Sequence, residues 1–223
     1  MPRAKKAAAG SDAWRNVEAR AALADPAISL LEHGTLISQE DGQETRYDPH
    51  LITNKLQATI VSYVSNPPKD GNGYTLWLNL LGYRQGGKSL AAELAFLPMA
   101  MYSPGHDHVC IADNKERADD LHERTQFCYK RWPEELRTPQ RATNEVRQLT
   151  FVHDAKMRVM SGHAEAVGIG QSVDSFHGSE LPYWKNAGRQ FSLINPGLIN
   201  RKHARMILES TPSPLSGPES GDE

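Results

Sequence analysis

The stretch YTLWLNLLGYRQGGKS, residues 74–89, decides the fold, because an apolar run passes directly into a glycine-rich loop that ends in Lys-Ser. Residues 74–80 are typical of a buried strand, and a helix is predicted from Ser89 to about residue 101. The loop between them fits the pattern G-x-x-x-x-G-K-[ST] at every fixed position. It consists of Gly82, Tyr83, Arg84, Gln85, Gly86, Gly87, Lys88 and Ser89. Strand, loop and helix in this order predict a phosphate-binding loop.

The residue types of this loop suit a nucleotide. Glycines let backbone N–H groups curl around phosphate oxygens, Lys88 can neutralise the β- and γ-phosphates, and the Ser89 hydroxyl can bind Mg²⁺. The helix that follows points its positive end at the same anion. We therefore predict ATP and Mg²⁺ as cofactors. Arg84 is unusual within such a loop. It could reach the γ-phosphate or sense hydrolysis, and the alternative is an arginine on the surface.

Strands and helices alternate along the rest of the chain. Further strands are predicted at 108–112, 149–153, 156–160, 172–178 and 205–208, and further helices at 12–23, 51–65, 114–132 and 187–194. This alternation predicts an α/β fold whose central sheet is mostly parallel and is flanked by helices. We expect three segments, namely an N-terminal arm over residues 1–50, the phosphate-loop domain over 51–211 and an irregular C-terminal tail over 212–223.

The composition is that of a globular chain with no dominant charge. Of the 223 residues 39% are hydrophobic, and 25 Lys and Arg against 27 Asp and Glu leave a net charge of −2. No global basic field attracts nucleic acid, so any DNA contact must come from a local patch. Two cysteines cannot form a disulfide framework, which predicts an intracellular protein. No run approaches 18 apolar residues, so no membrane span is expected.

Three other groups of residues have competing interpretations. His106, His108 and Cys110 alternate and could present a metal site on one strand face, but a buried small hydrophobe is the favoured interpretation of Cys110. The basic residues of 115–131 are interleaved with acidic ones, which favours a solvated helix face over a DNA contact. The tryptophans interpreted as packing residues are Trp77, Trp132 and Trp184.

Several segments, in order along the chain, resemble the ATPase domain of phage terminase large subunits. Gln57 lies where that family has an adenine-contacting glutamine, and residues 83–89 are similar to its arginine-containing Walker A. FHGSELPYW, residues 176–184, is similar to its Walker B segment in the variant with Ser-Glu in place of Asp-Glu. ESTP, residues 209–212, is similar to its coupling motif. The similarity runs from about residue 51 to residue 211.

The resemblance implies a fold and an activity. The fold would be a P-loop NTPase of the ASCE/RecA-like class. The activity would be Mg²⁺-dependent ATP hydrolysis that drives double-stranded DNA into a procapsid. Implied partners are a portal protein, the small terminase subunit and further copies of the chain in a ring, in the host cytoplasm. The family continues into a nuclease domain, which we expect to be absent from these 223 residues.

The resemblance also implies roles for individual residues. Glu180 would act on the attacking water, with Lys88 and Arg84 completing the catalytic set, and Asp174 is the competing carboxylate. Ser89 and Ser179 would face Mg²⁺, although Ser179 stands where the family has an aspartate. The predicted nucleotide contacts outside the loop are Gln57, Ser210 and Thr211. Candidates for an arginine that acts on a neighbouring subunit are Arg141, Arg147 and Arg158.

Three alternatives stay open at this point. A P-loop kinase would transfer phosphate to a small molecule, but it would need an arginine-rich lid, and none is evident in the sequence. A helicase-type ATPase would usually need a second motor domain, which the length does not allow. The third alternative is a nucleotide-binding module without catalysis, because Ser179 stands where the family has an aspartate. ATP turnover with and without DNA would separate the motor from these alternatives.

Overall fold

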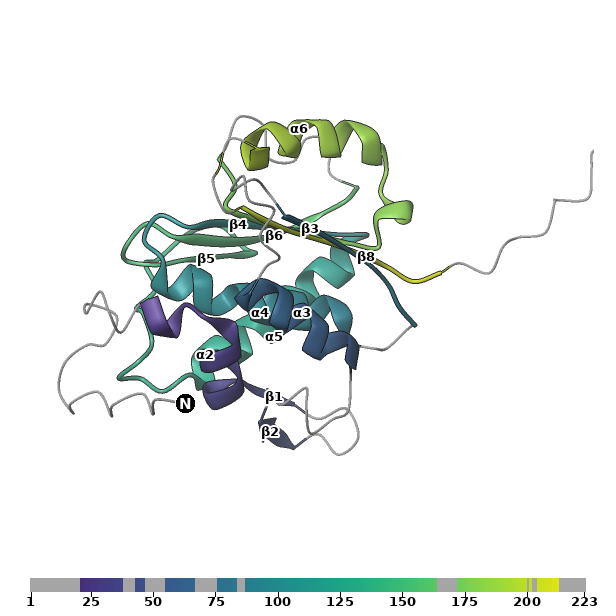
Figure 1. Ribbon diagram of the computed structural model, residues 1–223. Helices are drawn as coiled ribbons and strands as arrows, with labels where there is room; N and C mark the ends of the chain where they lie inside the picture. The colour runs from purple at the N-terminus through teal and green to yellow at the C-terminus, as the bar shows by residue number, and fades with distance from the viewer. Residues whose placement is uncertain are drawn as a thin grey trace, which may run out of the picture.

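The protein is described by a computed structural model, which covers residues 21–37, 43–46, 55–66, 76–83, 87–163, 172–199, 201 and 204–212. A central sheet lies between two layers of helices (Figure 1). The remaining residues lie outside the described part, including Arg84, Gln85 and Gly86 of the loop.

The sheet has six strands in the order β3-β8-β7-β4-β6-β5. Their bounds are β3 Leu76–Leu81, β8 Arg205–Ser210, β7 Ser175–Ser179, β4 Asp107–Ala112, β6 Lys156–Ser161 and β5 Gln148–Thr150. All neighbouring pairs are parallel except β5 with β6. The mostly parallel sheet predicted from the sequence is confirmed. Strand β8 lies between β3, which leads into the loop, and β7, which leads to Glu180.

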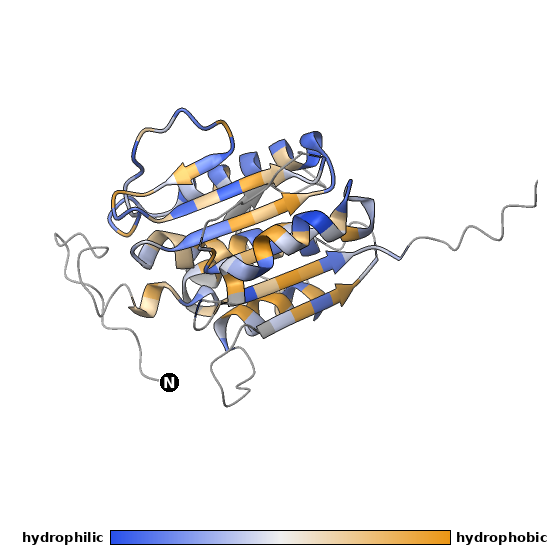
Figure 2. Cartoon of the chain, turned by 90° about the horizontal axis from the view of Figure 1, so that it is seen from above, coloured by the Kyte–Doolittle hydropathy of each residue, from blue (hydrophilic) through white to orange (hydrophobic). Residues whose placement is uncertain are grey.

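Helices cover both faces of the sheet. On one face lie α2 Pro26–His33, α3 Lys55–Ser65, α4 Lys88–Tyr102 and α5 Lys115–Arg131, and on the other lies α6 Ala187–Ile199 (Figure 1). A short 3₁₀ helix, η2 Leu181–Tyr183, precedes α6. Because both faces are covered, the central strands are apolar along much of their length (Figure 2). Strand β4 is fully buried from His108 to Ala112.

Helix α4 lies at the centre of the larger core. Thirteen of its residues are buried, and Phe96, Leu97 and Met101 have no exposed surface. It also carries Glu93, a carboxylate with no exposed surface. A buried carboxylate is costly unless it has partners, so Glu93 marks a polar element inside this core.

Helix α2 was not among the helices predicted from the sequence, because Pro26, which disfavours a helix interior, follows the helix predicted over 12–23. Residues 21–23 are helical, and Pro26 then opens α2 in the first turn, where its missing N–H costs nothing. The Asp25 carboxylate caps this helix by accepting from the Ala27 N–H at 2.9 Å. Leu30 is fully buried in the same core as α4, although it falls within the predicted arm. The boundary at residue 51 stays a prediction.

Small ordered elements lie outside the main sheet. A two-stranded antiparallel pair is formed by β1 Thr35–Ile37 and β2 Glu44–Arg46. Trp132 and Trp184 are buried as expected, whereas Trp77 is half exposed and meets Phe191 edge to face. Cys110 and Cys128 are buried, and neither belongs to a disulfide within the described residues. No described helix has the length and apolar character needed to span a membrane.

Candidate active site

The carboxyl ends of three neighbouring strands bring distant parts of the sequence together. Strand β3 leads into Gly82 and Tyr83, β7 leads into Glu180, and β8 leads into Thr211. Helix α4 begins at Lys88, on the same side. In a parallel sheet the carboxyl ends share one edge, which is where ligands bind in open α/β folds.

The described glycines of the loop are held closely. The Gly82 N–H donates to the Ser210 carbonyl at 3.0 Å, which ties the loop to β8. Gly87 caps α4 with a φ of 67°, a left-handed conformation that favours glycine. A Cβ on Gly87 would lie 2.2 Å from Gln57 Nε2, so Gln57 packs directly against the loop. Tyr83 is exposed. Roles for Arg84, Gln85 and Gly86 stay predictions, because these residues lie outside the described part.

Lys88 lies between two carboxylates. Its Nζ is 3.2 Å from Glu180 Oε1 and 3.1 Å from Glu209 Oε2. It also donates to Thr211 Oγ1 at 2.9 Å. The side chain is only 6% exposed, so the ammonium sits in a site with little water. Electrostatic interactions are stronger in such a site than in bulk solvent.

Glu180 has a strained backbone and a well-held carboxylate. Its φ of 55° and ψ of 48° lie in the left-handed region. This conformation costs a non-glycine residue about 1–3 kcal/mol, and such strained residues cluster at functional sites. One carboxylate oxygen accepts from the Thr211 N–H at 2.9 Å, and the other accepts from Thr211 Oγ1 at 2.7 Å. Ser210 Oγ donates to the first oxygen at 3.2 Å.

The charge state of Glu180 follows from these contacts. Burial raises the pKa of the carboxyl, but the Thr211 hydrogen bonds and Lys88 outweigh it and hold the pKa below its ordinary value. The carboxylate is therefore ionised at neutral pH. An ionised, oriented carboxylate can position a water molecule and accept its proton.

Asp174 lies at the opposite end of β7. Its carboxylate accepts from the Asp107 N–H at 2.9 Å and pairs with Arg201 at 3.4 Å. The five residues of β7 separate it from Glu180, which at about 3.3 Å per residue exceeds 15 Å. Of the two carboxylates weighed from the sequence, only Glu180 lies beside Lys88.

The two predicted metal-facing serines meet beside Glu209, which is not among the site residues predicted from the sequence. Ser89 Oγ lies 3.2 Å from Ser179 Oγ and donates to Glu209 Oε1 at 2.5 Å. Glu209 is buried; burial raises its pKa, but interactions with His177, Ser179 and Ser89 lower it to about 2. The available signal was a charged residue at the end of the apolar run RMIL, directly before Ser210.

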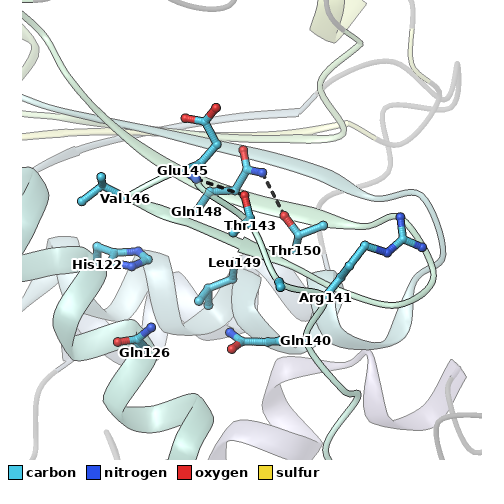
Figure 3. Close-up of a pocket in the computed structure, with 11 residues that line it drawn as sticks. His122, Gln126, Gln140, Arg141, Thr143, Glu145, Val146, Gln148, Leu149 and Thr150 are labelled. Atoms are coloured by element: carbon cyan, nitrogen blue, oxygen red, sulfur yellow. Dashed lines mark hydrogen bonds between the residues drawn. The ribbon is translucent and has the colours of Figure 1, made fainter.

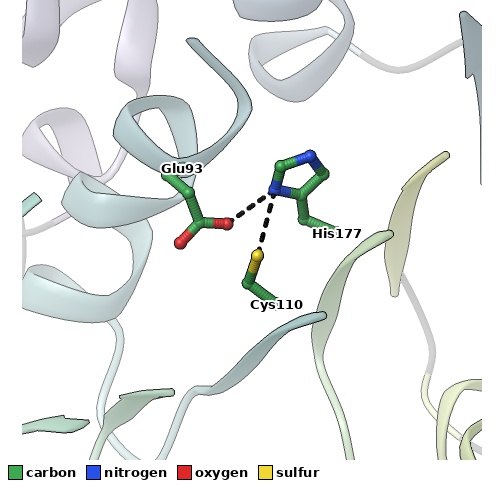
Figure 4. Close-up of side chains that lie close together, drawn as sticks. All are labelled: Glu93, Cys110 and His177. Carbon is green, nitrogen blue, oxygen red and sulfur yellow. Dashed lines mark hydrogen bonds and ion pairs between the residues drawn. The ribbon is translucent and has the colours of Figure 1, made fainter. Parts of the chain in front are cut away.

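Glu93, Cys110 and His177 form a buried polar cluster (Figure 4). His177 Nε2 is 3.5 Å from Glu209 Oε1, and His177 Nδ1 is 2.8 Å from Glu93 Oε1 and 3.4 Å from Cys110 Sγ. His108 Nε2 reaches the same Glu93 oxygen at 3.1 Å. The three alternating residues noted from the sequence therefore do not form one group. Cys110 contacts His177, whereas His106 and His108 both lie 2.8 Å from Ser175 Oγ.

Solved structures share this arrangement of strands and helices. The HK97 bacteriophage large terminase aligns with a TM-score of 0.62 and 15% identity, over 84% of this chain and 37% of that one. The chain has the fold of phage large terminases. A large terminase from a thermophilic bacteriophage aligns with a TM-score of 0.50 and 10% identity, over 71% of this chain and 39% of that one. No family model and no curated protein sequence matches the chain.

The likeness to large terminases concerns the fold, and residue roles rest on the contacts described above. This chain spans less than two-fifths of either large terminase. The three arginines considered for action on a neighbouring subunit all pair within this chain. Arg141 pairs with Asp154 at 2.8 Å, Arg147 with Asp119 at 3.4 Å and Arg158 with Asp107 at 2.7 Å.

A hollow lies away from the loop that carries Lys88. It has a volume of about 400 Å³ and opens between α5 and the segment 140–150 (Figure 3). Its polar lining includes His122, Gln126, Arg141, Thr143, Glu145 and Gln148. The described ends of β3, β7 and β8 contribute none of its lining residues, so it is separate from the candidate active site.

Proposed function

We propose that this chain is the ATP-hydrolysing motor domain of a phage large terminase, which drives double-stranded DNA into a procapsid. The observation that carries the proposal is the 3.2 Å contact between Lys88 Nζ and Glu180 Oε1, at the edge where β3, β8 and β7 end. A lysine placed for phosphates and an ionised carboxylate placed for water thus share one site. Phosphoryl transfer to water needs both groups.

Each residue of the site has one task in this proposal. Lys88 and the backbone of 82–89 bind the phosphates, with Gly87 opening the turn toward them. Glu180 orients the attacking water and accepts its proton, and Thr211 holds that carboxylate with two hydrogen bonds. Arg84 is proposed to stabilise charge at the γ-phosphate. Gln57 is proposed to contact the adenine, from its position against Gly87.

Mg²⁺ is the second proposed cofactor, with Ser89 and Ser179 as hydroxyl donors. Their oxygens lie 3.2 Å apart at the start of α4, and hard oxygen donors suit this ion. When bound, Mg²⁺ would neutralise charge on the phosphates. A neutral hydroxyl is a weaker partner for a divalent cation than the carboxylate usual at this position.

The contacts at the end of β8 support coupling of hydrolysis to movement. Ser210 and Thr211 contact Glu180, and Thr211 also contacts Lys88. A change in charge at the phosphates would therefore act directly on Ser210 and Thr211 at the end of β8. This refines the proposed role of both hydroxyls, because they hold the catalytic carboxylate as well as lying near the phosphate site.

The wider proposal concerns the assembly. We propose double-stranded DNA, a portal protein, the small terminase subunit and further copies of the chain in a ring as partners, in the host cytoplasm. Residues 51–211 are proposed as the motor domain, between an arm and a tail. A small-molecule kinase is not favoured, because two solved structures that share this fold are large terminases.

The test is ATP hydrolysis by the chain with Mg²⁺ or EDTA, and with or without double-stranded DNA. We expect Mg²⁺-dependent turnover that Lys88→Ala abolishes and that DNA increases, while Glu180→Gln still binds ATP. Asp174→Asn is the matched control, because it removes the competing carboxylate at the far end of β7. Nucleotide binding without turnover, even at high protein concentration with DNA, would identify a non-catalytic binding module. Turnover that requires a small-molecule acceptor would identify a kinase.

A further inference from the structure

We infer that Glu209, from the strand next to the Walker B strand, supplies the carboxylate toward Mg²⁺ that Ser179 lacks. The inference rests on the proposed Mg²⁺–ATP chemistry and extends it to a residue without an assigned role. In P-loop NTPases the ion is held by the loop's Ser or Thr and by an aspartate of the Walker B strand. Here the residue before Glu180 is Ser179, so the second of these groups has to come from elsewhere.

The sheet places Glu209 where this carboxylate is needed. Ser179 and Glu209 are register partners on the parallel strands β7 and β8. The Glu180 N–H donates to the Glu209 carbonyl at 2.8 Å, which fixes the two strand ends against each other. Because β8 lies between β3 and β7, a side chain at its end is closer to the loop than one on β7. A glutamate has the reach to extend from there to Ser89.

The observed contacts match that geometry. Ser89 Oγ donates to Glu209 Oε1 at 2.5 Å and lies 3.2 Å from Ser179 Oγ. Lys88 Nζ lies 3.1 Å from the other Glu209 oxygen, Oε2. One carboxylate thus contacts both side chains of the Lys-Ser pair that faces the phosphates. Carboxylate and hydroxyl oxygens are donors that Mg²⁺ accepts together with phosphate oxygens.

A second layer of side chains holds Glu209 in this position. His177 Nε2 lies 3.5 Å from Glu209 Oε1, and Glu93 Oε1 lies 2.8 Å from the other ring nitrogen (Figure 4). All three residues are buried. Glu93 thus orients His177, and His177 orients Glu209. Groups that bind metal ions are commonly held by such a second layer of polar side chains. His177 and Glu93 are therefore positioning residues for Glu209.

The alternative is that Glu209 serves only as an ion-pair partner of Lys88. The two assignments differ in their dependence on metal. An ion-pair partner would affect nucleotide binding equally in Mg²⁺ and in EDTA, because Lys88 contacts phosphates in both. A metal-facing carboxylate affects the affinity for the ion and leaves nucleotide binding in EDTA nearly unchanged.

The experiment measures Mn²⁺, as a paramagnetic substitute for Mg²⁺, by electron paramagnetic resonance with a non-hydrolysable ATP analogue at saturation. We expect Glu209→Gln to raise the Kd for Mn²⁺ at least tenfold, with nucleotide affinity in EDTA changed less than threefold. Asp174→Asn is the matched control, since it removes a carboxylate at the far end of β7 and should change the Kd for Mn²⁺ less than threefold. The double variant Ser179→Asp/Glu209→Gln returns a carboxylate to the Walker B strand and should recover most of the loss.

Two further measurements cover a variant that fails to fold. Glu209→Asp keeps the charge beside Lys88 but shortens the side chain, so it should also weaken Mn²⁺ binding. Wild-type protein labelled with ¹³C-glutamate should show a ¹³C coupling to bound Mn²⁺. A Kd for Mn²⁺ that is indifferent to residue 209, or equal losses of nucleotide affinity with and without metal, overturns the assignment. Absence of any nucleotide binding by the wild type would instead overturn the proposed function itself.

Discussion

The two ends of the central sheet use charge in different ways. At the carboxyl end, the Lys88 side chain is 6% exposed and shares two carboxylates, Glu180 and Glu209. At the amino end, Arg201 pairs with Asp174 at 3.4 Å, and the arginine is 45% exposed. Burying charges costs more desolvation than their attraction returns unless the geometry is very good, whereas exposed pairs cost and contribute little. The cluster at the carboxyl end is therefore explained by chemistry, and the Arg201–Asp174 pair at the amino end by solubility and modest stability.

The largest expected effect comes from removing the cation at the carboxyl end. Lys88→Ala should lower ATP turnover by at least about 100-fold, because a charge placed toward the transferring phosphoryl group is lost. It should also lower the free energy of unfolding by about 3 kcal/mol, since two carboxylates lose their shared counter-ion. Arg201→Ala is the counterpart at the amino end and should cost about 1 kcal/mol or less, because its pair with Asp174 is partly exposed. Urea denaturation measures the loss of unfolding free energy in both variants. Equal losses would contradict the proposed difference between the two ends of the sheet.

The next effect separates the two ends of a single strand. Glu180→Gln should lower turnover by about 10²–10⁴, the usual contribution of a general base, while ATP affinity changes less than threefold. Asp174→Asn, at the amino end of β7, should leave turnover within threefold of wild type. Single-turnover hydrolysis and equilibrium ATP binding provide both numbers. A loss of turnover in Asp174→Asn alone would reverse the assignment of the two carboxylates.

A smaller effect tests how Glu180 is held. Thr211→Val keeps the side-chain shape and the backbone N–H but removes the hydroxyl that donates to Glu180 Oε1. The pKa of Glu180 should move up toward its ordinary value, so the acid limb of the rate profile shifts to higher pH. Turnover near neutral pH should fall about tenfold. Thr211→Ser, which keeps the hydroxyl, is the control, and an unshifted acid limb in Thr211→Val would show that the backbone N–H and Lys88 suffice.

The carboxyl end was largely predictable from the sequence because its signals are local. The run from residue 74 to residue 89 places a strand, a loop and a helix in fixed order, and each residue type has a phosphate-binding reason. The contact between Lys88 and Glu180 needs only the general rule that parallel strands end at one edge. The candidate residues of the loop and of Glu180 follow from such rules together with the terminase resemblance.

Other features depend on pairings that no local pattern encodes. Glu209 gains its importance because β8 lies between β3 and β7, and strand order is a property of the whole sheet. The Glu93–His177 contact joins a helix to a strand 84 residues later, so neither residue signals the other. Helix α2 was missed because Pro26 was weighed as a breaker, although a proline in the first turn of a helix is favourable.

The last expected effect lies at the amino end and concerns acid stability. His106 is buried, with its Nε2 2.8 Å from Ser175 Oγ. Burial, together with His108, Arg205, Arg201 and His153, lowers the pKa of His106 to about 3. The unfolded chain then binds a proton that the folded chain does not, at every pH between about 6.5 and 3. As the pH falls through this window, the free energy of unfolding should therefore fall as well. His106 accounts for at most about 1.4 kcal/mol of this loss per pH unit.

His106→Asn should remove that contribution, so its free energy of unfolding should depend less steeply on pH between 6.5 and 4. Urea denaturation at several pH values compares the two slopes, and equal slopes would show that His106 does not carry the acid sensitivity. Glu180 acts in the same direction but only at lower pH. Its pKa is held below the ordinary value of 4.5, so its stabilising contribution is present above that pH and is lost as the pH falls further. The slope between about pH 6.5 and 5 should therefore report on His106 and not on Glu180.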